Sequence, residues 1–348
     1  MAVTDDRLKD TVQALIAPGK GILAVDETPG TLTSRFQALS IVSTPESRRD
    51  YRELLFRTEG IERHISGAIL NDETLRQQAV DGTPMGEVLS RRGILPGVKV
   101  DRGIFPLAGA PGEGITEGLD GLRPRLEEYF RMGARFAKWR ALFTIGLGLP
   151  SQTCIDANAH ALARYAALCQ EAGVAPIVEV ELLLDGQYEI QTCADATEAT
   201  LRAVFREMVG QRAQLEGLLL KVNMVQSGKD TQQRAEPEEV AVFTVASLKR
   251  TVPAAVPGIV FLSGGQSDDE SVRNLNAIAT QAAASGAPWQ LSFSFARALQ
   301  GAPMRAWAGK AENVPLAQEV FQHRAQVTST ARRGEYAPER ELLGAGGT

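Results

Sequence analysis

Eight short apolar runs, separated by segments with helical periodicity, place the strongest constraint on how this chain can fold. The runs begin near residues 21, 65, 93, 136, 176, 215, 258 and 289, roughly 28 to 44 residues apart. This spacing leaves room for one strand, one helix and two loops in each unit. Uninterrupted apolar strands that alternate with helices are typical of a parallel sheet covered on both faces.

Helix signals fill most of the gaps between the runs. Thr44 suits an N-cap and Pro45 the first helical position, which predicts a helix that continues to Phe56. An apolar face near the N-terminus predicts an amphipathic helix there, without the layout of a signal peptide. Further helices are predicted at about 157–172, 196–214, 238–250 and 267–284.

Eight such units predict an α/β fold with a single (β/α)8 TIM barrel, so that residues 1–348 form one domain. The alternative is an open, doubly wound sheet. Polar and charged residues follow many different strands, and strand ends converge on one mouth only in a barrel, which favours the barrel. The polar segment at about 332–348 is predicted to be a mobile C-terminal tail.

The composition excludes several classes of protein. Hydrophobic residues make up 44% and charged residues 23%, as in ordinary globular proteins, and the net charge of −5 argues against a nucleic-acid partner. Cys154, Cys169 and Cys193 form no CxxC pair, which favours a reducing compartment and a cytoplasmic location. No apolar run approaches the roughly 18 residues of a membrane span, so no membrane partner is expected.

Lys221 ends the apolar run that starts at residue 215. Lysine is almost never fully buried unless it is paired or functional. A desolvated lysine loses its proton more readily and becomes a nucleophile toward carbonyl groups. The position of this amine therefore indicates an active site at the carboxyl ends of the strands.

Two charged pairs interrupt neighbouring apolar runs. Lys138 and Arg140 lie two residues apart in one run, and Glu179 and Glu181 lie two residues apart in the next. Since side chains alternate between the faces of a strand, both members of a pair face the same side. We expect both pairs to point into the barrel, with the cations beside the carboxylates.

An anion-binding pattern follows the last two runs. Ser263 and Gly264 begin a glycine-rich turn into a helix, where backbone N–H groups and the helix N-terminus favour an anion. Arg297 follows the eighth run and can hold a phosphate with two N–H groups. Loops after the seventh and eighth strands of such barrels frequently bind phosphate.

Each of these residues also has a purely structural alternative. Asp26 can cap a helix, Lys99 can be a solvated surface lysine, and Ser-Gly-Gly can be a tight turn. Lys221 and the pair Lys138–Glu179 can belong to ion pairs that only satisfy one another. All of these alternatives would have to hold at one end of one barrel, which favours the functional interpretation.

The combination predicts Schiff-base chemistry on a phosphorylated sugar. Lys221 would attack a ketone, and a positive Lys138 beside it would disfavour protonation of its amine. The resulting iminium is an electron sink, so that a neighbouring C–C bond can break or form. Glu179 and Glu181 would transfer protons, while Asp26 would orient a hydroxyl or assist Lys221.

No cofactor or metal is predicted. His64, His160 and His323 form no cluster with ligand spacing, which disfavours metal chemistry. Neither a P-loop nor a dinucleotide-binding glycine pattern is present.

Several long segments, in the right order, resemble the class I (Schiff-base) fructose-1,6-bisphosphate aldolases over about residues 1–335. They are LAVDETPGT (23–31), GVKVDRGIFPLAG (97–109), GLDG (118–121), FAKWR (136–140), PIVEVELL (176–183), LEGLLLKVNMV (215–225), FLSGGQS (261–267) and LSFSFARALQ (291–300). The resemblance implies a (β/α)8 barrel, usually a homotetramer. It implies reversible cleavage of fructose 1,6-bisphosphate to dihydroxyacetone phosphate and glyceraldehyde 3-phosphate, in glycolysis or its reversal.

The resemblance also implies residue roles. Lys221 matches the imine-forming lysine, and the acid–base residues around it are Asp26, Lys138, Glu179 and Glu181. The residues that resemble the family's site for the ketone-side phosphate are Ser263, Gly264 and Arg297. The residues that fall where the other phosphate and the sugar hydroxyls are held are Lys99, Thr28, Thr31, Arg35 and Arg140.

Three features depart from the family pattern. Thr28 and Thr31 stand where serines are frequent, and the hydroxyls are kept. Ala296 stands where glycine is usual, and it would be strained only if the backbone there required a positive φ. The sequence ends in Thr348 where animal and plant members have a tyrosine that visits the site, which argues against proton transfer by the tail.

Two rival functions remain open. One is an imine-forming aldolase that acts on another phospho-sugar, and Lys99 and Arg140 opposite Arg297 argue instead for a bisphosphate. The other is a non-catalytic scaffold built on the aldolase fold. The intact set of charged residues around Lys221 argues against the scaffold.

Overall fold

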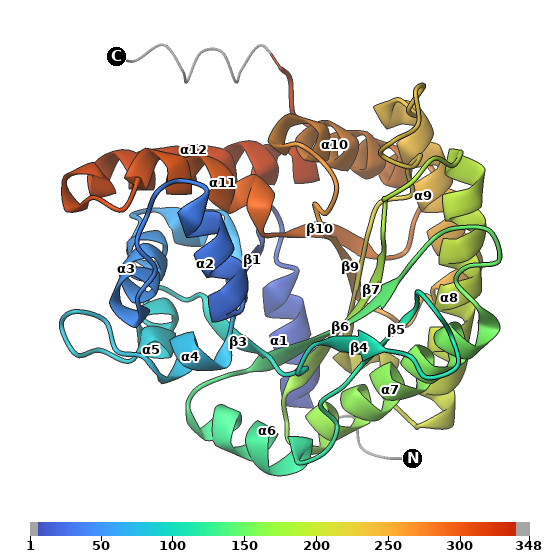
Figure 1. Cartoon of the computed structure of the whole chain (residues 1–348), viewed down its shortest axis with the longest axis horizontal. Coiled ribbons are helices and arrows are strands. Elements are labelled where there is room, and N and C mark those ends of the chain that lie inside the picture. Colours follow the sequence, from blue (N-terminus) through green and yellow to red (C-terminus); the bar gives the residue numbers. More distant parts are fainter. Residues whose placement is uncertain (1–5, 339–348) are drawn as a thin grey trace.

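Eight parallel strands close into a barrel in the computed structural model, which describes residues 6–338 (Figure 1). The strands are β1 (Gly21–Ala24), β2 (Ile65–Leu70), β3 (Leu95–Lys99), β6 (Phe136–Phe143), β7 (Ala175–Leu182), β8 (Leu219–Val222), β9 (Gly258–Phe261) and β10 (Gln290–Phe295). Their order around the barrel is β1-β10-β9-β8-β7-β6-β3-β2. Because β1 pairs with both β10 and β2, the predicted barrel is confirmed and the open sheet is wrong.

Apolar side chains fill the barrel interior at the amino-terminal ends of the strands. The helix α1 (Asp6–Leu15) closes this end and lies behind the barrel in Figure 1. Leu8, Val12 and Leu15 of this helix belong to one buried cluster with Phe136 of β6. The Phe136 ring occupies the space beside Gly97, where a Cβ would lie 2.3 Å from it. A closed apolar floor leaves the opposite mouth, at the carboxyl ends of the strands, for a functional site.

The helices surround the barrel, and a second cluster of buried apolar residues fills the layer between helices and strands. The predicted helices are present as α1, α3 (Pro45–Phe56), α7 (Gln152–Glu171), α8 (Ile190–Gly210), α9 (Pro237–Thr251) and α10 (Asp268–Ala284). Thr44 caps α3 as predicted, because its hydroxyl accepts a hydrogen bond from the backbone N–H of Ser47.

Several elements have no counterpart among the predictions. These are α2 (Pro29–Gln37), α4 (Asp72–Arg76), α5 (Met85–Ser90), α6 (Leu122–Arg131), α11 (Arg297–Trp307), α12 (Val314–Arg332) and the antiparallel pair β4 (Ile104–Pro106) and β5 (Gly114–Thr116).

The apolar run that begins at residue 215 is only partly a strand. Its first residues, Leu215–Gly217, form a 3₁₀ turn, and β8 starts at Leu219. Gln170 of α7 fixes this turn, because its Nε2 donates to the Gln214 carbonyl and its Oε1 accepts from the Gln214 N–H, both at 2.8 Å. The prediction of a strand from residue 215 is wrong there, since an apolar run does not reveal a contact from a helix 44 residues earlier.

The predicted mobile tail at 332–348 lies only in part within the described residues. Arg332 is the last residue of α12, and the backbone N–H of Tyr336 donates to Asn276 Oδ1 of α10 at 2.9 Å. Positions 339–348 lie outside the described residues. Within residues 6–338, no helix combines the length and the apolar character that crossing a membrane requires.

Candidate active site

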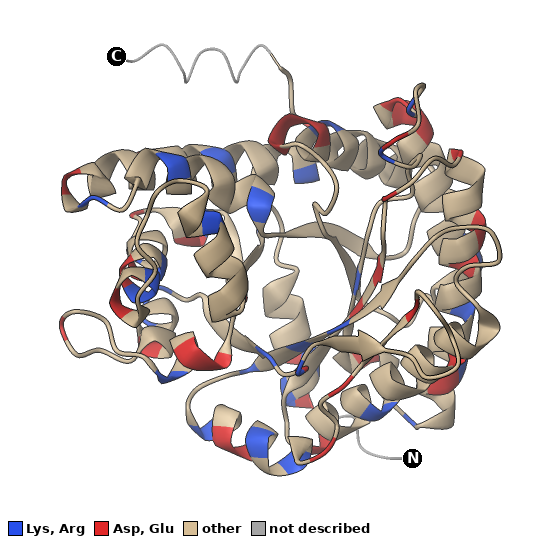
Figure 2. Ribbon diagram, viewed as in Figure 1, with Lys and Arg blue, Asp and Glu red and all other residues tan. Residues whose placement is uncertain are grey.

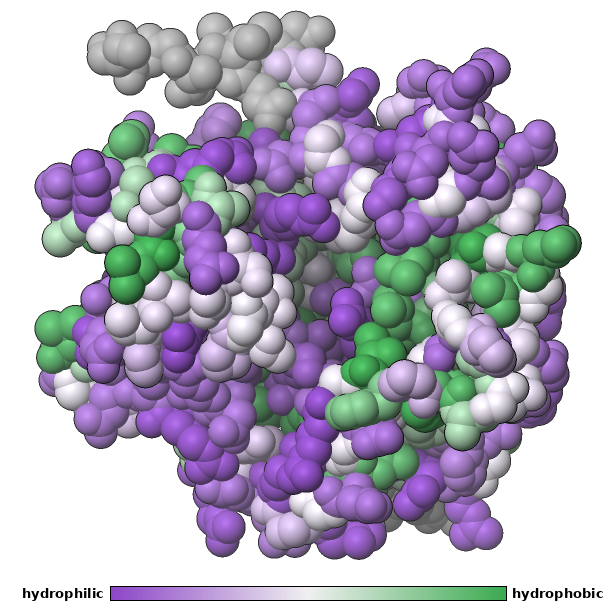
Figure 3. Space-filling view, in the orientation of Figure 1, coloured by the Kyte–Doolittle hydropathy of each residue, from purple (hydrophilic) through white to green (hydrophobic). Residues whose placement is uncertain are grey.

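A cavity of about 290 Å³ opens at the carboxyl ends of the barrel strands. Figure 3 shows a hollow at the centre of this face with hydrophilic residues gathered around it, and Figure 2 shows charged residues on the central strands as well as on the outer helices. Every residue that the sequence analysis assigns to the site lines this cavity. They are Asp26, Thr28, Thr31, Arg35, Lys99, Lys138, Arg140, Glu179, Glu181, Lys221, Ser263, Gly264 and Arg297.

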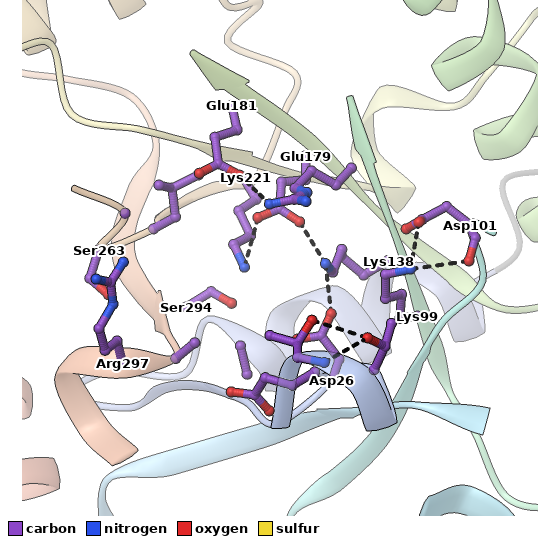
Figure 4. Close-up of a pocket in the computed structure, with 18 of the residues that line it drawn as sticks. Asp26, Lys99, Asp101, Lys138, Glu179, Glu181, Lys221, Ser263, Ser294 and Arg297 are labelled. Atoms are coloured by element: carbon purple, nitrogen blue, oxygen red, sulfur yellow. Dashed lines mark hydrogen bonds and ion pairs between the residues drawn. The ribbon is translucent and has the colours of Figure 1, made fainter. Parts of the chain in front are cut away.

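Four buried charges form a continuous chain in the cavity (Figure 4). Lys221 Nζ lies 3.0 Å from Glu179 Oε1, and Glu179 Oε2 lies 2.9 Å from Lys138 Nζ. Lys138 Nζ also contacts Asp26 Oδ2 at 2.7 Å. The Lys221 and Glu179 side chains are each only 4% exposed. Two ammonium groups and two carboxylates therefore compensate one another where bulk water is largely excluded.

The strand register explains which charges meet. Glu179 of β7 lies directly opposite Lys221 of β8. On its other side Glu179 lies opposite Arg140 of β6, while Lys138 lies opposite Ile177. Glu179 therefore reaches Lys138 diagonally, two residues along β6, as the stagger between tilted barrel strands allows.

Burial and neighbouring charges oppose each other in setting the protonation states. Burial raises the pKa of Asp26, but the positive charges of Lys138 and Lys221 outweigh it and leave the pKa below its ordinary value of 3.8. Burial likewise raises the pKa of Glu179, and Lys138, Lys221 and Arg140 together bring it well below its ordinary value. Burial lowers the pKa of Lys138, but Asp26 and Glu179 raise it above 10.5. At neutral pH both carboxyl groups are therefore ionised and Lys138 is an ammonium.

Two further ion pairs lie toward the mouth. Arg140 Nη1 is 2.9 Å from Glu181 Oε2, and Lys99 Nζ is 2.5 Å from Asp101 Oδ1. The Arg140 side chain is 39% exposed, so this cation remains accessible to a ligand.

Ser263 and Arg297 lie on the side of the cavity opposite Lys99 and Asp101 (Figure 4). Arg297 is the first residue of α11, and within residues 6–338 no acidic side chain forms an ion pair with it. Gly264 allows close approach of the backbone, because a Cβ there would lie 2.9 Å from Glu181 Oε1. This side of the cavity therefore offers an uncompensated guanidinium and a close backbone to an anion.

The loop after β1 supplies the other residues near the mouth. Thr28 is the N-cap of α2, and its Oγ1 accepts a hydrogen bond of 3.2 Å from the backbone N–H of Thr31. Arg35 Nη1 contacts Glu27 Oε1 at 2.5 Å. Thr28 thus has a structural role in addition to its place at the cavity.

Three polar residues line the cavity although no role was predicted for them from the sequence. They are Glu27, Asp101 and Ser294. The Ser294 hydroxyl is buried and has no hydrogen-bond partner among residues 6–338. Glu27 and Asp101 follow barrel strands and Ser294 lies near the end of β10, so the rule that identified Lys221 applies to them too. Ala296 has a φ of −102°, so the backbone there does not require the positive φ that would favour glycine.

The fold agrees with comparisons to known proteins. The family described as "Fructose-bisphosphate aldolase class-I" matches residues 7–346. The chain is 52% identical over 332 residues to a protein of Xanthomonas campestris pv. campestris named "Probable fructose-bisphosphate aldolase class 1", with 95% of this chain and 98% of the relative covered. It is 50% identical over 325 residues to "Fructose-bisphosphate aldolase 6, cytosolic" of Arabidopsis thaliana, with 93% and 90% covered.

A solved structure is also similar. The fructose-bisphosphate aldolase of Plasmodium falciparum, determined in complex with TRAP and a small-molecule inhibitor, superposes with a TM-score of 0.94 at 44% identity, with 97% of each chain covered. This chain belongs to the class-I fructose-bisphosphate aldolase family.

Proposed function

We propose that the protein cleaves fructose 1,6-bisphosphate reversibly to dihydroxyacetone phosphate and glyceraldehyde 3-phosphate, through a Schiff base on Lys221. The observation that carries this proposal is the contact of 3.0 Å between Lys221 Nζ and Glu179 Oε1 within the cavity. It places a buried amine and a carboxylate in contact inside the cavity. A neutral amine in such a place is a nucleophile for a ketone carbon.

The same contacts support a complete proton path. Lys221 Nζ adds to the C2 carbonyl, and the carbinolamine loses its hydroxyl as water when a carboxyl group of Glu179 or Glu181 supplies a proton. The iminium then accepts the electron pair of the C3–C4 bond, while a carboxylate removes the proton of the C4 hydroxyl. Protonation at C3 and hydrolysis of the imine return the free amine. The cationic Lys138 favours the ionised form of Glu179, and Asp26 holds Lys138 in place through its own contact with the ammonium group.

Two groups of residues, each with at least one cation, support a substrate with a phosphate at each end. Ser263, Gly264 and Arg297 would hold the ketone-side phosphate, and a second group, across the cavity, would hold the other phosphate and the sugar hydroxyls. This second group consists of Thr28, Thr31, Arg35, Lys99 and Arg140. A bisphosphate satisfies both groups, whereas a monophosphate leaves one of them without an anion.

Assembly and location are proposed with the activity. A single domain, a homotetramer and a role in glycolysis follow from the usual properties of the family. A cytoplasmic location is supported by two plant relatives that are described as cytosolic.

Substitution Lys221→Met tests the proposal. Methionine keeps the length and apolar stem of the side chain but has no amine, so we expect turnover to be lost while the fold persists. Incubation of the unaltered protein with dihydroxyacetone phosphate and borohydride should give a covalent adduct that peptide mass spectrometry locates on Lys221.

Lys249→Met is the matched control, since Lys249 is an exposed lysine of α9 that donates to the Ser285 carbonyl. It should retain both turnover and the adduct. Retained aldol cleavage in Lys221→Met, or an adduct on another lysine, would remove Lys221 from the mechanism.

A further inference from the structure

Gln300 is a buried amide that lies behind the cavity. It belongs to α11, one helical turn after Arg297, and its side chain is 1% exposed. Its Nε2 donates two hydrogen bonds, to the Ala24 carbonyl at 2.6 Å and to Glu27 Oε1 at 2.8 Å. These bonds join the helix that carries Arg297 to the loop after β1.

Glu27 connects this amide to the mouth of the cavity. The same oxygen, Oε1, accepts from Gln300 and from Arg35 Nη1, the latter at 2.5 Å. The backbone carbonyl of Glu27 is fixed as well, because Arg52 Nη2 and Asn71 Nδ2 both donate to it at 2.8 Å. The main chain of Glu27 is therefore held independently, while Gln300 and Arg35 together determine where its carboxylate lies.

Among the three linked side chains Gln300, Glu27 and Arg35, a ligand can reach Arg35. Its side chain is 28% exposed and lines the cavity, whereas the Glu27 side chain is only 6% exposed. A free arginine side chain loses rotamer entropy when it is immobilised. A guanidinium already held by Glu27 has lost part of that freedom before the ligand arrives, so less binding energy is spent on ordering it.

We infer that Gln300 is a positioning residue for one end of the substrate: it holds the Glu27 carboxylate, which in turn holds Arg35 ready for a phosphate. The inference rests on the proposed function, in which Arg35 is one of the residues that bind the second phosphate, across the cavity from Arg297. A neutral amide suits this role, because it donates to two oxygens without adding a charge that would compete for the carboxylate. Gln300 touches neither substrate nor reacting atoms, so its effect is confined to the affinity for that phosphate.

The test compares two sugars in the variant Gln300→Leu. Fructose 1,6-bisphosphate carries the phosphate that Arg35 would hold, and fructose 1-phosphate lacks it. We expect kcat/KM for the bisphosphate to fall about tenfold, mainly through KM, since a remote group of the substrate loses its preorganised partner. The value for fructose 1-phosphate should change by less than about twofold.

Tyr51→Phe is the matched control. The Tyr51 hydroxyl is buried and donates to the backbone carbonyl of Gln300 at 3.1 Å, so its loss disturbs the same helix but leaves the side-chain contacts between Gln300, Glu27 and Arg35 in place. It should leave the ratio between the two sugars unchanged. A second variant, Glu27→Gln, keeps an acceptor oxygen but removes the charge that holds Arg35, and it should shift the ratio in the same direction as Gln300→Leu.

The outcomes separate the two hypotheses. Equal losses on both sugars in Gln300→Leu, or no loss on either, would overturn the inference, as would an equal shift of the ratio in Tyr51→Phe. If Gln300→Leu does not fold, an unchanged ratio in Glu27→Gln overturns it. Failure of the unaltered protein to cleave either sugar would instead overturn the proposed function, and the inference with it.

Discussion

At the scale of single residues, Lys138 is the centre of the buried charges. It contacts Asp26 and Glu179 at 2.7 and 2.9 Å, and its own side chain is 5% exposed. A carboxyl group whose pKa is lower in the folded protein stabilises the fold above its unfolded pKa, about 4, and loses that contribution as the pH falls through the folded value. The raised pKa of Lys138 acts in the other direction, and its contribution is complete below its unfolded pKa of about 10.4.

Lys138→Met should therefore destabilise the protein in a pH-dependent way. At pH 7 we expect the free energy of unfolding to fall by about 3–5 kcal/mol, because two buried carboxylates lose their shared cation. The deficit should shrink between pH 5 and pH 4, since without Lys138 the pKa of Asp26 and of Glu179 rises and both groups can be buried in the neutral form. Urea unfolding at pH 7, 5 and 4 measures this.

Lys229→Met is the control for this prediction. Lys229 is 45% exposed and pairs with Asp185, so its removal should change the free energy of unfolding by less than about 0.5 kcal/mol at every pH. A deficit in Lys138→Met that is as large at pH 4 as at pH 7 would contradict the role assigned to the two carboxyl groups.

At the scale of elements, Arg332 links the last helix, α12, to the closed end of the barrel through hydrogen bonds. Its guanidinium donates to the carbonyls of Ile16 at 2.6 Å, Ala17 at 2.5 Å and Leu291 at 2.9 Å, and also to that of Lys20. These carbonyls follow α1 or belong to β10, so one side chain joins three parts of the fold. Arg332 is 7% exposed.

Arg332→Met should lower the free energy of unfolding by about 2–4 kcal/mol, because several buried carbonyls lose a charged donor. The closed end of the barrel lies away from the cavity, so kcat of the folded variant should not change. Arg333→Met is the matched control, since Arg333 is 43% exposed and pairs with Glu335. Equal destabilisation by the two substitutions, measured by urea unfolding, would show that the contacts of Arg332 are unimportant.

At the scale of the whole molecule, the proposed assembly can be tested by mass. One chain has a mass of 37.4 kDa, and a homotetramer would have about 150 kDa. We expect light scattering on the eluted protein to give the larger value across a tenfold range of loading concentration. A mass near that of one chain, with cleavage of fructose 1,6-bisphosphate intact, would show that the activity does not need the assembly.

The sequence predicted four of the long helices and missed several elements whose signals are weak. The helices α7, α8, α9 and α10 each run for 15 residues or more and carry a repeated apolar face. By contrast α4 has 5 residues, too few to show a period, and α11 contains Pro303, which ordinarily argues against a helix interior. Length alone did not decide what could be predicted, since α12 has 19 residues and was not predicted.

The sequence by itself determined the kinds of residue at the site and the strand ends on which they stand. The local sequence identifies Lys221, Glu179 and Lys138, because an ionisable residue within an apolar run can be recognised before its partner is known. Only the tertiary structure decided which charges meet. Glu179 bridges two lysines because of the stagger between β6, β7 and β8, and Gln300 meets Glu27 across 273 residues because the barrel closes. Contacts of this kind depend on register and closure, which the local pattern of a sequence does not encode.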